Sequence, residues 1–189
     1  MFIQTESTPN PRTLKFLPGR DVLGHGSRDY AGADTAVDSP LAQALFGIEG
    51  VERVYLGGDF LSITKAEVIE WPHLKPHVLA AIMDHYMAGR PVVLAGDEES
   101  GEDDTVYEGE AAEIVREIKE IIEARVRPAV ARDGGDITFH SWNSDTGIVR
   151  LNMRGSCAGC PSSALTLKQG IENMLRHYVP EVSGVEQVV

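Results

Sequence analysis

Hydrophobic residues in the second half of the chain recur at spacings that switch between those of helices and those of strands. Ile114, Ile118 and Ile121 share one face of a helix with a period of about 3.6 residues, and the opposite face is charged. Two β-prone runs then flank a polar turn, a second helical stripe follows, and a short apolar tail ends the sequence. These patterns predict an α-β-β-α-β order: a helix over 108–126, strands over 136–142 and 147–153, a helix over 161–178 and a strand over 182–189. Arg127-Pro128 is expected to break or kink the first helix.

The first half of the chain shows a similar mixture of helical and strand patterns. Ser39 and Pro40 are typical of a helix N-terminus, as cap and first-turn residue. Gly57-Gly58-Asp59 separates two β-prone runs and predicts a tight hairpin turn. The predicted elements are strands over 2–5 and 13–17, a loop over 21–36, a helix from 40 to 49, strands over 51–56 and 60–65, and a helix from 72 or 76 to 88. Both halves therefore belong to the α+β class, with helices and a small sheet in layers.

Acidic residues are concentrated between the two halves. Residues 95–106 contain six carboxylates and no basic residue, which is half of the net charge of −12. Large apolar residues are almost absent from this stretch, so we expect a solvated flexible linker. The predicted organisation is an N-terminal domain over 1–94, the acidic linker over 95–106 and a C-terminal domain over 107–189. An acidic patch that docks a basic partner is the alternative interpretation of the linker.

The overall composition restricts the class of protein. Hydrophobic residues make up 42% of the chain and charged residues 24%, which is typical of a folded globular protein. The net negative charge argues against general binding to nucleic acid. No apolar run is long enough to cross a membrane, and residues 1–16 show neither a signal-peptide nor a transit-peptide pattern. We therefore expect a cytoplasmic protein with no nucleic-acid or membrane partner.

The chain contains two cysteines, Cys157 and Cys160, which form one C-x-x-C pair before a predicted helix N-terminus. Backbone N–H groups and the positive end of the helix dipole favour thiolates there, so the pair is suited to metal binding or redox chemistry. Gly155, Ser156 and Gly159 leave the small-residue rim that an inorganic group needs. A thiol–disulfide oxidoreductase fits less well, because a hairpin precedes the pair where a βαβ pattern is expected. A structural loop with two incidental thiols is the third interpretation.

A metal site requires more ligands than one C-x-x-C pair supplies. Tetrahedral zinc and cubane clusters take four ligands, so two are missing. His140 and His177 are candidates within the chain, although a mid-strand position and a last-turn position are more typical of packing or helix-dipole roles. The same cysteine pair from a second protomer across a two-fold axis completes the set more simply. A symmetric dimer that shares one cluster is therefore the favoured hypothesis.

Several motifs in both halves resemble one known family, the NifU-like (Nfu-type) iron–sulfur cluster scaffold and carrier proteins. In the second half, the motifs are Arg127-Pro128, Asp133-Gly-Gly-Asp-Ile137 and Gly155-Ser-Cys-Ala-Gly-Cys-Pro-Ser-Ser163. In the first half they are Thr8-Pro-Asn-Pro11, Leu14-Lys-Phe16, Gly50-Val51, Asp59-Phe60, Thr64-Lys65 and Trp71. The resemblance covers almost the whole chain.

This resemblance implies a non-enzymatic carrier. It implies a [4Fe–4S] cluster that Cys157 and Cys160 of each of two protomers bind, received from upstream cluster-assembly proteins and delivered to apo-proteins. The N-terminal domain, which has no thiol, is expected to contact partners or regulate the dimer. Asp133 and Asp136 beside Gly134-Gly135 are interpreted as turn and cap residues without a catalytic role. A thiol–disulfide oxidoreductase and a zinc-binding structural dimer remain the alternatives.

Overall fold

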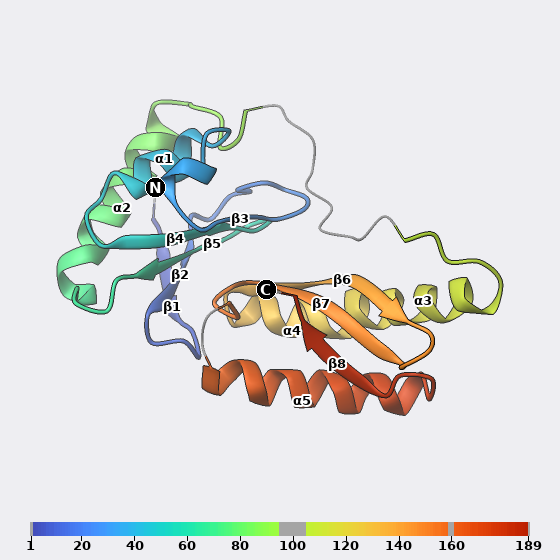
Figure 1. Ribbon diagram of the computed structural model, residues 1–189. Helices are drawn as coiled ribbons and strands as arrows, with labels where there is room; N and C mark the ends of the chain where they lie inside the picture. The colour runs from blue at the N-terminus through green and yellow to red at the C-terminus, as the bar shows by residue number, and fades with distance from the viewer. Residues whose placement is uncertain (1, 95–104, 159–160, 189) are drawn as a thin grey trace. The chain divides into compact units, whose positions relative to one another are not determined.

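The computed structural model describes residues 2–94, 105–158 and 161–188, with 161–164 described by their backbone alone. The chain divides into two compact units, Met1–Glu99 and Ser100–Val189 (Figure 1). Helices and strands are mixed in both units, which confirms the predicted α+β class. Most of the predicted acidic linker, residues 95–104, lies outside the described residues. The domain boundaries at 94 and 107 therefore stay predictions.

The N-terminal unit contains a five-stranded antiparallel sheet in the order β1-β2-β5-β4-β3. Its strands are β1 (Gln4–Ser7), β2 (Thr13–Leu17), β3 (Arg28–Tyr30), β4 (Val51–Leu56) and β5 (Leu61–Lys65). Leu14, Ile63 and Val54 are neighbours in the strand register and belong to one hydrophobic cluster. Because side chains alternate along a strand, these residues place an apolar face on one side of the sheet.

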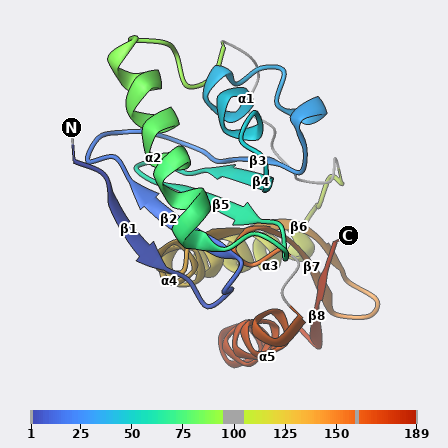
Figure 2. The same ribbon diagram turned by 90° about the vertical axis from the view of Figure 1, so that its left-hand side faces the viewer.

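Two helices cover the apolar face of this sheet. They are α1 (Pro40–Phe46) and α2 (Trp71–Met87), and Figure 2 shows both on the same side of the sheet. Leu45 and Ile82 are buried in the cluster that the sheet and the helices share. The predicted cap is confirmed, because the backbone N–H of Ala42 donates to Ser39 Oγ at 3.1 Å.

The expectation of a loop throughout residues 21–36 was wrong at two places. Residues 28–30 form β3, and Ala33–Thr35 form a short 3₁₀ helix. β3 pairs with β4, and Arg53 Nε and Nη2 donate to the two carboxylate oxygens of Asp29 at 2.8 Å each. Tyr30 lies in the core. A three-residue edge strand is held by partners distant in sequence, which the local spacing of hydrophobic residues does not reveal.

His85 is a buried titratable group in the last turn of α2. Burial, and then the positive charge of Arg90, lower the pKa of its imidazole. The unfolded chain therefore binds a proton more readily than the folded unit, and stability falls as the pH drops below about 6.5, the pKa of an unperturbed histidine.

We expect His85→Leu to lose less stability than the wild type between pH 7.5 and 5.5. Urea unfolding with hydrogen exchange of α2 amides measures this, and His77→Leu at an exposed position of α2 is the control.

The C-terminal unit contains three strands in the order β6-β7-β8. These are β6 (Gly135–Asn143), β7 (Ile148–Gly155) and β8 (Gly184–Gln187). β6 and β7 form the predicted antiparallel hairpin, whereas β8 pairs with β7 in parallel. The helix that joins them is α5 (Pro161–Tyr178), so β7, α5 and β8 make a βαβ unit. The sequence pattern predicted the last strand but not its parallel pairing.

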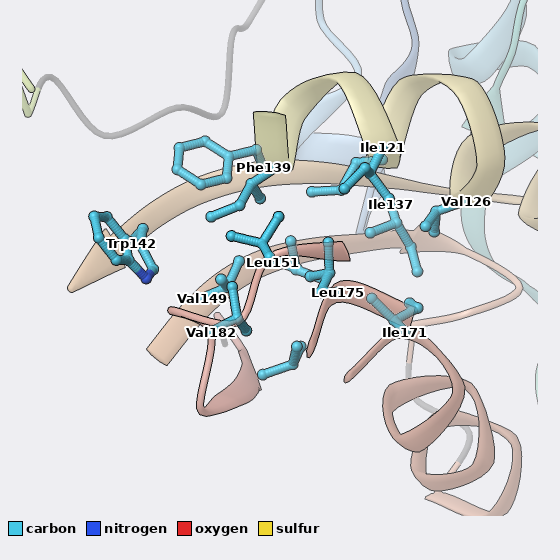
Figure 3. Close-up of a cluster of buried hydrophobic side chains, with 14 of the residues drawn as sticks. Ile121, Val126, Ile137, Phe139, Trp142, Val149, Leu151, Ile171, Leu175 and Val182 are labelled. Carbon is cyan, nitrogen blue, oxygen red and sulfur yellow. The ribbon is translucent and has the colours of Figure 1, made fainter. Parts of the chain in front are cut away.

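One hydrophobic core holds this unit together. Figure 3 shows Ile121 from the first helix and Ile171 and Leu175 from α5 around Ile137 and Leu151 of the sheet. The helices therefore share one face of the sheet, as predicted. None of the helices in the described part of the chain has the length and apolar character that crossing a bilayer demands.

The first helix of this unit contains an irregular turn. It consists of α3 (Glu110–Ile121), a π-helical turn over Ile122–Val126 and α4 (Arg127–Arg132). Buried residues at Ile118, Ile122, Val126 and Val130 recur every four residues, a spacing that drifts around a regular α-helix. The wider π turn keeps them facing the core. The predicted break or kink at Arg127-Pro128 was wrong, because both residues lie in α4 and the irregular turn precedes them.

Candidate functional site

The cysteine loop lies between β7, which ends at Gly155, and α5, which begins at Pro161. Pro161 occupies the first position of the helix, as predicted. Cys157 lies in the described part of the loop, whereas Cys160 lies outside the described residues. The structure therefore places one predicted ligand at the junction of a strand and a helix. For Cys160 it adds only that the next residue starts α5.

Cys157 is buried against the start of β6. Its exposed fraction is 6%, and it belongs to the hydrophobic core of the C-terminal unit. A Cβ atom built on Gly135 would lie 2.6 Å from Cys157 Sγ and 2.8 Å from the carbonyl oxygen of Arg154. No real side chain tolerates such distances, so the sulfur occupies space that only glycine leaves open at position 135.

The loop is also tied to the turn that precedes β6. The backbone N–H of Ser156 donates to the carbonyl oxygen of Gly134 at 3.2 Å, and the Ser156 hydroxyl donates to the carbonyl oxygen of Asp133. Gly134 and Gly155 have φ angles of 78° and 64°, which favour glycine at both positions. The predicted turn role of Asp133 agrees with its position at the end of α4. The turn and the cysteine loop therefore form one connected backbone assembly.

Asp136 has a role that the sequence interpretation missed. Arg127 Nε and Nη2 donate to the two carboxylate oxygens of Asp136 at 2.8 Å each, and the backbone N–H of Ile137 donates to Asp136 Oδ1 at 2.9 Å. Arg127 Nη1 also contacts Glu123 at 2.8 Å. Hydrogen bonds to Asp136 raise the pKa of the Arg127 guanidinium above its usual range. The prediction of a turn or cap residue was therefore wrong for Asp136, which anchors a strand to a helix.

The histidines do not complete a ligand set in the described part of one chain. His140 lies within β6, and the ring of His177 packs edge-on against Tyr178 with centroids 5.0 Å apart. Among the described residues, no three His, Cys, Asp or Glu side chains are grouped closely enough to hold a metal ion. The half-buried position of His140 agrees with a packing role, and the exposed position of His177 in the last turn of α5 agrees with a helix-dipole role.

The described part of the loop holds Cys157 as a buried thiol shortly before the first residue of α5. The N-terminal end of α5 favours a thiolate in the loop before it, while the sulfur, a carbonyl oxygen and the Ser156 hydroxyl fill the space beside Gly135. Reactive redox cysteines are usually partly exposed, whereas Cys157 is buried. The fold and this loop define a protein of two α+β units with one paired-thiol site.

Comparisons with known proteins extend this description. A family model described as "Scaffold protein Nfu/NifU N terminal" matches residues 3–89, and one described as "NifU-like domain" matches residues 118–186. NifU-like protein 5, mitochondrial, of Arabidopsis thaliana is 50% identical over 187 residues, 99% of this chain and 68% of that protein. NFU1 iron-sulfur cluster scaffold homolog, mitochondrial, of Drosophila sechellia is 50% identical over 189 residues, 100% of this chain and 65% of that protein. The chain therefore belongs to the Nfu/NifU family of scaffold proteins.

A solved structure is also similar to part of the chain. The solution structure of a NifU-like protein from Saccharomyces cerevisiae has 31% sequence identity and a TM-score of 0.45, and the match covers 49% of this chain and 84% of that one. The chain spans about two thirds of the length of the relatives named above.

The expected cytoplasmic location is contradicted by these comparisons. The relatives from Arabidopsis and Drosophila are named as mitochondrial proteins. Targeting information lies in segments that are separate from the folded domains, so the composition of the folded units does not identify a compartment. The sequence-based expectation of a cytoplasmic protein was therefore wrong.

Proposed function

We propose that this chain is a non-enzymatic iron–sulfur cluster carrier. In this proposal, Cys157 and Cys160 of each of two protomers bind one [4Fe–4S] cluster as cargo. The cluster comes from upstream assembly proteins and passes to apo-proteins. The N-terminal domain contacts partners or regulates the dimer, and the acidic linker over 95–106 lets the two domains move.

The observation that carries this proposal is the environment of Cys157 in a chain that has two cysteines. The sulfur lies before α5 and occupies the space that the missing side chain of Gly135 leaves open. Cubane clusters take four cysteine thiolates, and one chain supplies two. A two-fold dimer provides the other two, and a cluster shared across such an interface can be released when the protomers separate. The iron–sulfur cluster named for the Drosophila relative agrees with this cargo.

A thiol–disulfide oxidoreductase is the second candidate, because one observation favours it. The parallel pairing of β8 with β7 puts the C-x-x-C pair at the strand-to-helix junction of a βαβ unit. That is the context in which such pairs serve redox chemistry. The burial of Cys157 does not separate the two candidates, since thiol exchange and a cluster shared between protomers both require a sulfur that can be reached from outside.

Native mass spectrometry after anaerobic reconstitution with iron and sulfide separates the candidates. The carrier predicts a dimer that holds four irons and four sulfides, because a cubane needs the thiolates of both protomers. A dimer with one zinc ion supports the structural alternative, and a metal-free monomer with disulfide-coupled turnover supports the oxidoreductase. Either of these results contradicts the carrier.

A further inference from the structure

We propose that the Arg127–Asp136 ion pair positions the cysteine loop. The ion pair holds Gly135 against Cys157 and so sets the position of the ligand sulfur. The role of this sulfur as a cluster ligand rests on the proposed function. Its geometry and its test concern the thiol itself and need no cluster.

The pair has the geometry of a strong, orienting contact. Arg127 makes two parallel hydrogen bonds of 2.8 Å to the carboxylate of Asp136, whose side chain is 6% exposed. A two-bond contact between a guanidinium and a carboxylate fixes direction as well as distance. Glu123, which is 61% exposed, occupies the remaining side of the guanidinium. One side of the Arg127 guanidinium therefore contacts Glu123 on the π-helical turn. Its other side contacts Asp136 of β6.

The position of Asp136 connects this pair to the sulfur. Asp136 follows Gly135 in β6, and its carboxylate also accepts the N–H of Ile137. The ion pair thus fixes the Asp136 side chain and, through it, the peptide group that follows. Gly134 and Gly135 carry no side chains that could fix this segment by packing, and glycine has the greatest backbone freedom. The anchor at Asp136 compensates for that freedom where Gly135 meets Cys157 Sγ.

Arg127 occupies its position because of the π-helical turn. The turn over Ile122–Val126 keeps Ile122 and Val126 in the core, and α4 then begins with Arg127. Glu123, on the turn itself, bonds to Arg127 four residues later. The irregular turn and the ion pair are therefore parts of one arrangement that links the helix to the cysteine loop. Such turns are frequent at functional sites.

The N-terminal unit contains a matched control for this ion pair. Arg53 makes the same two 2.8 Å bonds to Asp29, and the side-chain exposures are 32% and 8%, against 29% and 6% for Arg127 and Asp136. The Arg53–Asp29 pair joins β4 to β3 and lies in the unit that has no cysteine. Equal substitutions in the two pairs therefore show whether the effect on the thiol is specific to the pair in its own unit, and urea unfolding of each variant separates it from lost stability of that unit.

The experiment measures alkylation of Cys157 by iodoacetamide in the reduced, metal-free full chain. A Cys160→Ser background leaves one thiol, and mass spectrometry gives its rate. Arg127→Lys keeps the charge but loses the two-bond contact, and Asp136→Asn keeps the shape. We expect both to alkylate roughly tenfold faster than the parent. Each substitution removes a hydrogen bond between charged groups, so the loop opens more often and exposes the thiol. Arg53→Lys should leave the rate within about twofold, because a contact within the other compact unit does not hold the segment that opens.

Rates for Arg127→Lys and Asp136→Asn that match the parent, with native circular dichroism, would overturn the positioning role. An equal acceleration in Arg53→Lys would overturn it too, because the effect would then be general. Arg127→Lys is the milder change because it keeps an ion pair, so it decides the matter if Asp136→Asn does not fold. Failure of the reconstituted dimer to hold a cluster, with accelerated alkylation in both variants, would reject the carrier while leaving the positioning role intact.

Discussion

Cys157→Ser is expected to abolish cluster binding by the reconstituted protein. In the proposed dimer, one substitution removes two of the four thiolates, because both protomers carry the change. A serine hydroxyl stays protonated near neutral pH and does not replace a thiolate ligand. We expect Cys160→Ser to have the same effect. Iron and sulfide per protein, measured by native mass spectrometry after anaerobic reconstitution, should fall from a full cluster per dimer to background.

Ser144→Ala is the control for this measurement. Ser144 is exposed in the turn between β6 and β7, at the opposite end of the hairpin from the cysteine loop. It should retain the wild-type cluster content. Circular dichroism must show that the cysteine variants fold, because a hydroxyl buried at position 157 costs about 1–3 kcal/mol when it lacks a partner. A full cluster in either folded cysteine variant would mean that other side chains complete the site.

The elements with strong local signals were predicted well from the sequence. α5 occupies the predicted residues Pro161–Tyr178, because a long apolar stripe begins at a proline suited to a first turn and ends near another proline. β4 also matches its prediction, since a glycine-rich turn limits the strand on one side. Both elements are specified by residues close together in the sequence.

The elements that were missed depend on distant partners. β3 is a short strand whose Asp29 bonds to Arg53 of β4, and no local pattern shows that pairing. β8 was predicted, but its parallel pairing with β7 follows from the path of α5 across the sheet. The π-helical turn could have been suspected from the spacing of Ile118, Ile122, Val126 and Val130, which exceeds the α-helical period.

The candidate site was predicted by residue type but not by its packing. The two cysteines stood out because they are the only thiols in the sequence. The contact between Gly135 and Cys157, and the ion pair between Arg127 and Asp136, join residues of different secondary-structure elements. A glycine next to another glycine suggests a turn, whereas the requirement at position 135 is space for a sulfur. Only the three-dimensional arrangement distinguishes these two reasons.

Gly135→Ala is expected to destabilise the C-terminal unit by about 1–3 kcal/mol, the cost of overpacking a filled interior. The new Cβ would lie 2.6 Å from Cys157 Sγ and 2.8 Å from a backbone carbonyl oxygen, so the cysteine loop must move. Gly135 does not have a positive φ angle, so the cost is one of space and not of backbone strain. We also expect weaker cluster retention, because a displaced sulfur no longer matches its partner thiolates. Urea unfolding and the cluster half-life under a chelator measure the two effects.

Gly170→Ala provides the matched control for this substitution. Gly170 lies within α5, and a Cβ built there meets nothing within 4 Å. Alanine in a helix is more favourable than glycine by about 1 kcal/mol, so this variant should gain stability and keep its cluster. The two glycine-to-alanine changes are thus expected to move stability in opposite directions. A Gly135→Ala protein with wild-type stability and cluster half-life would show that the loop adapts freely, and that close contact with Gly135 does not set the position of Cys157.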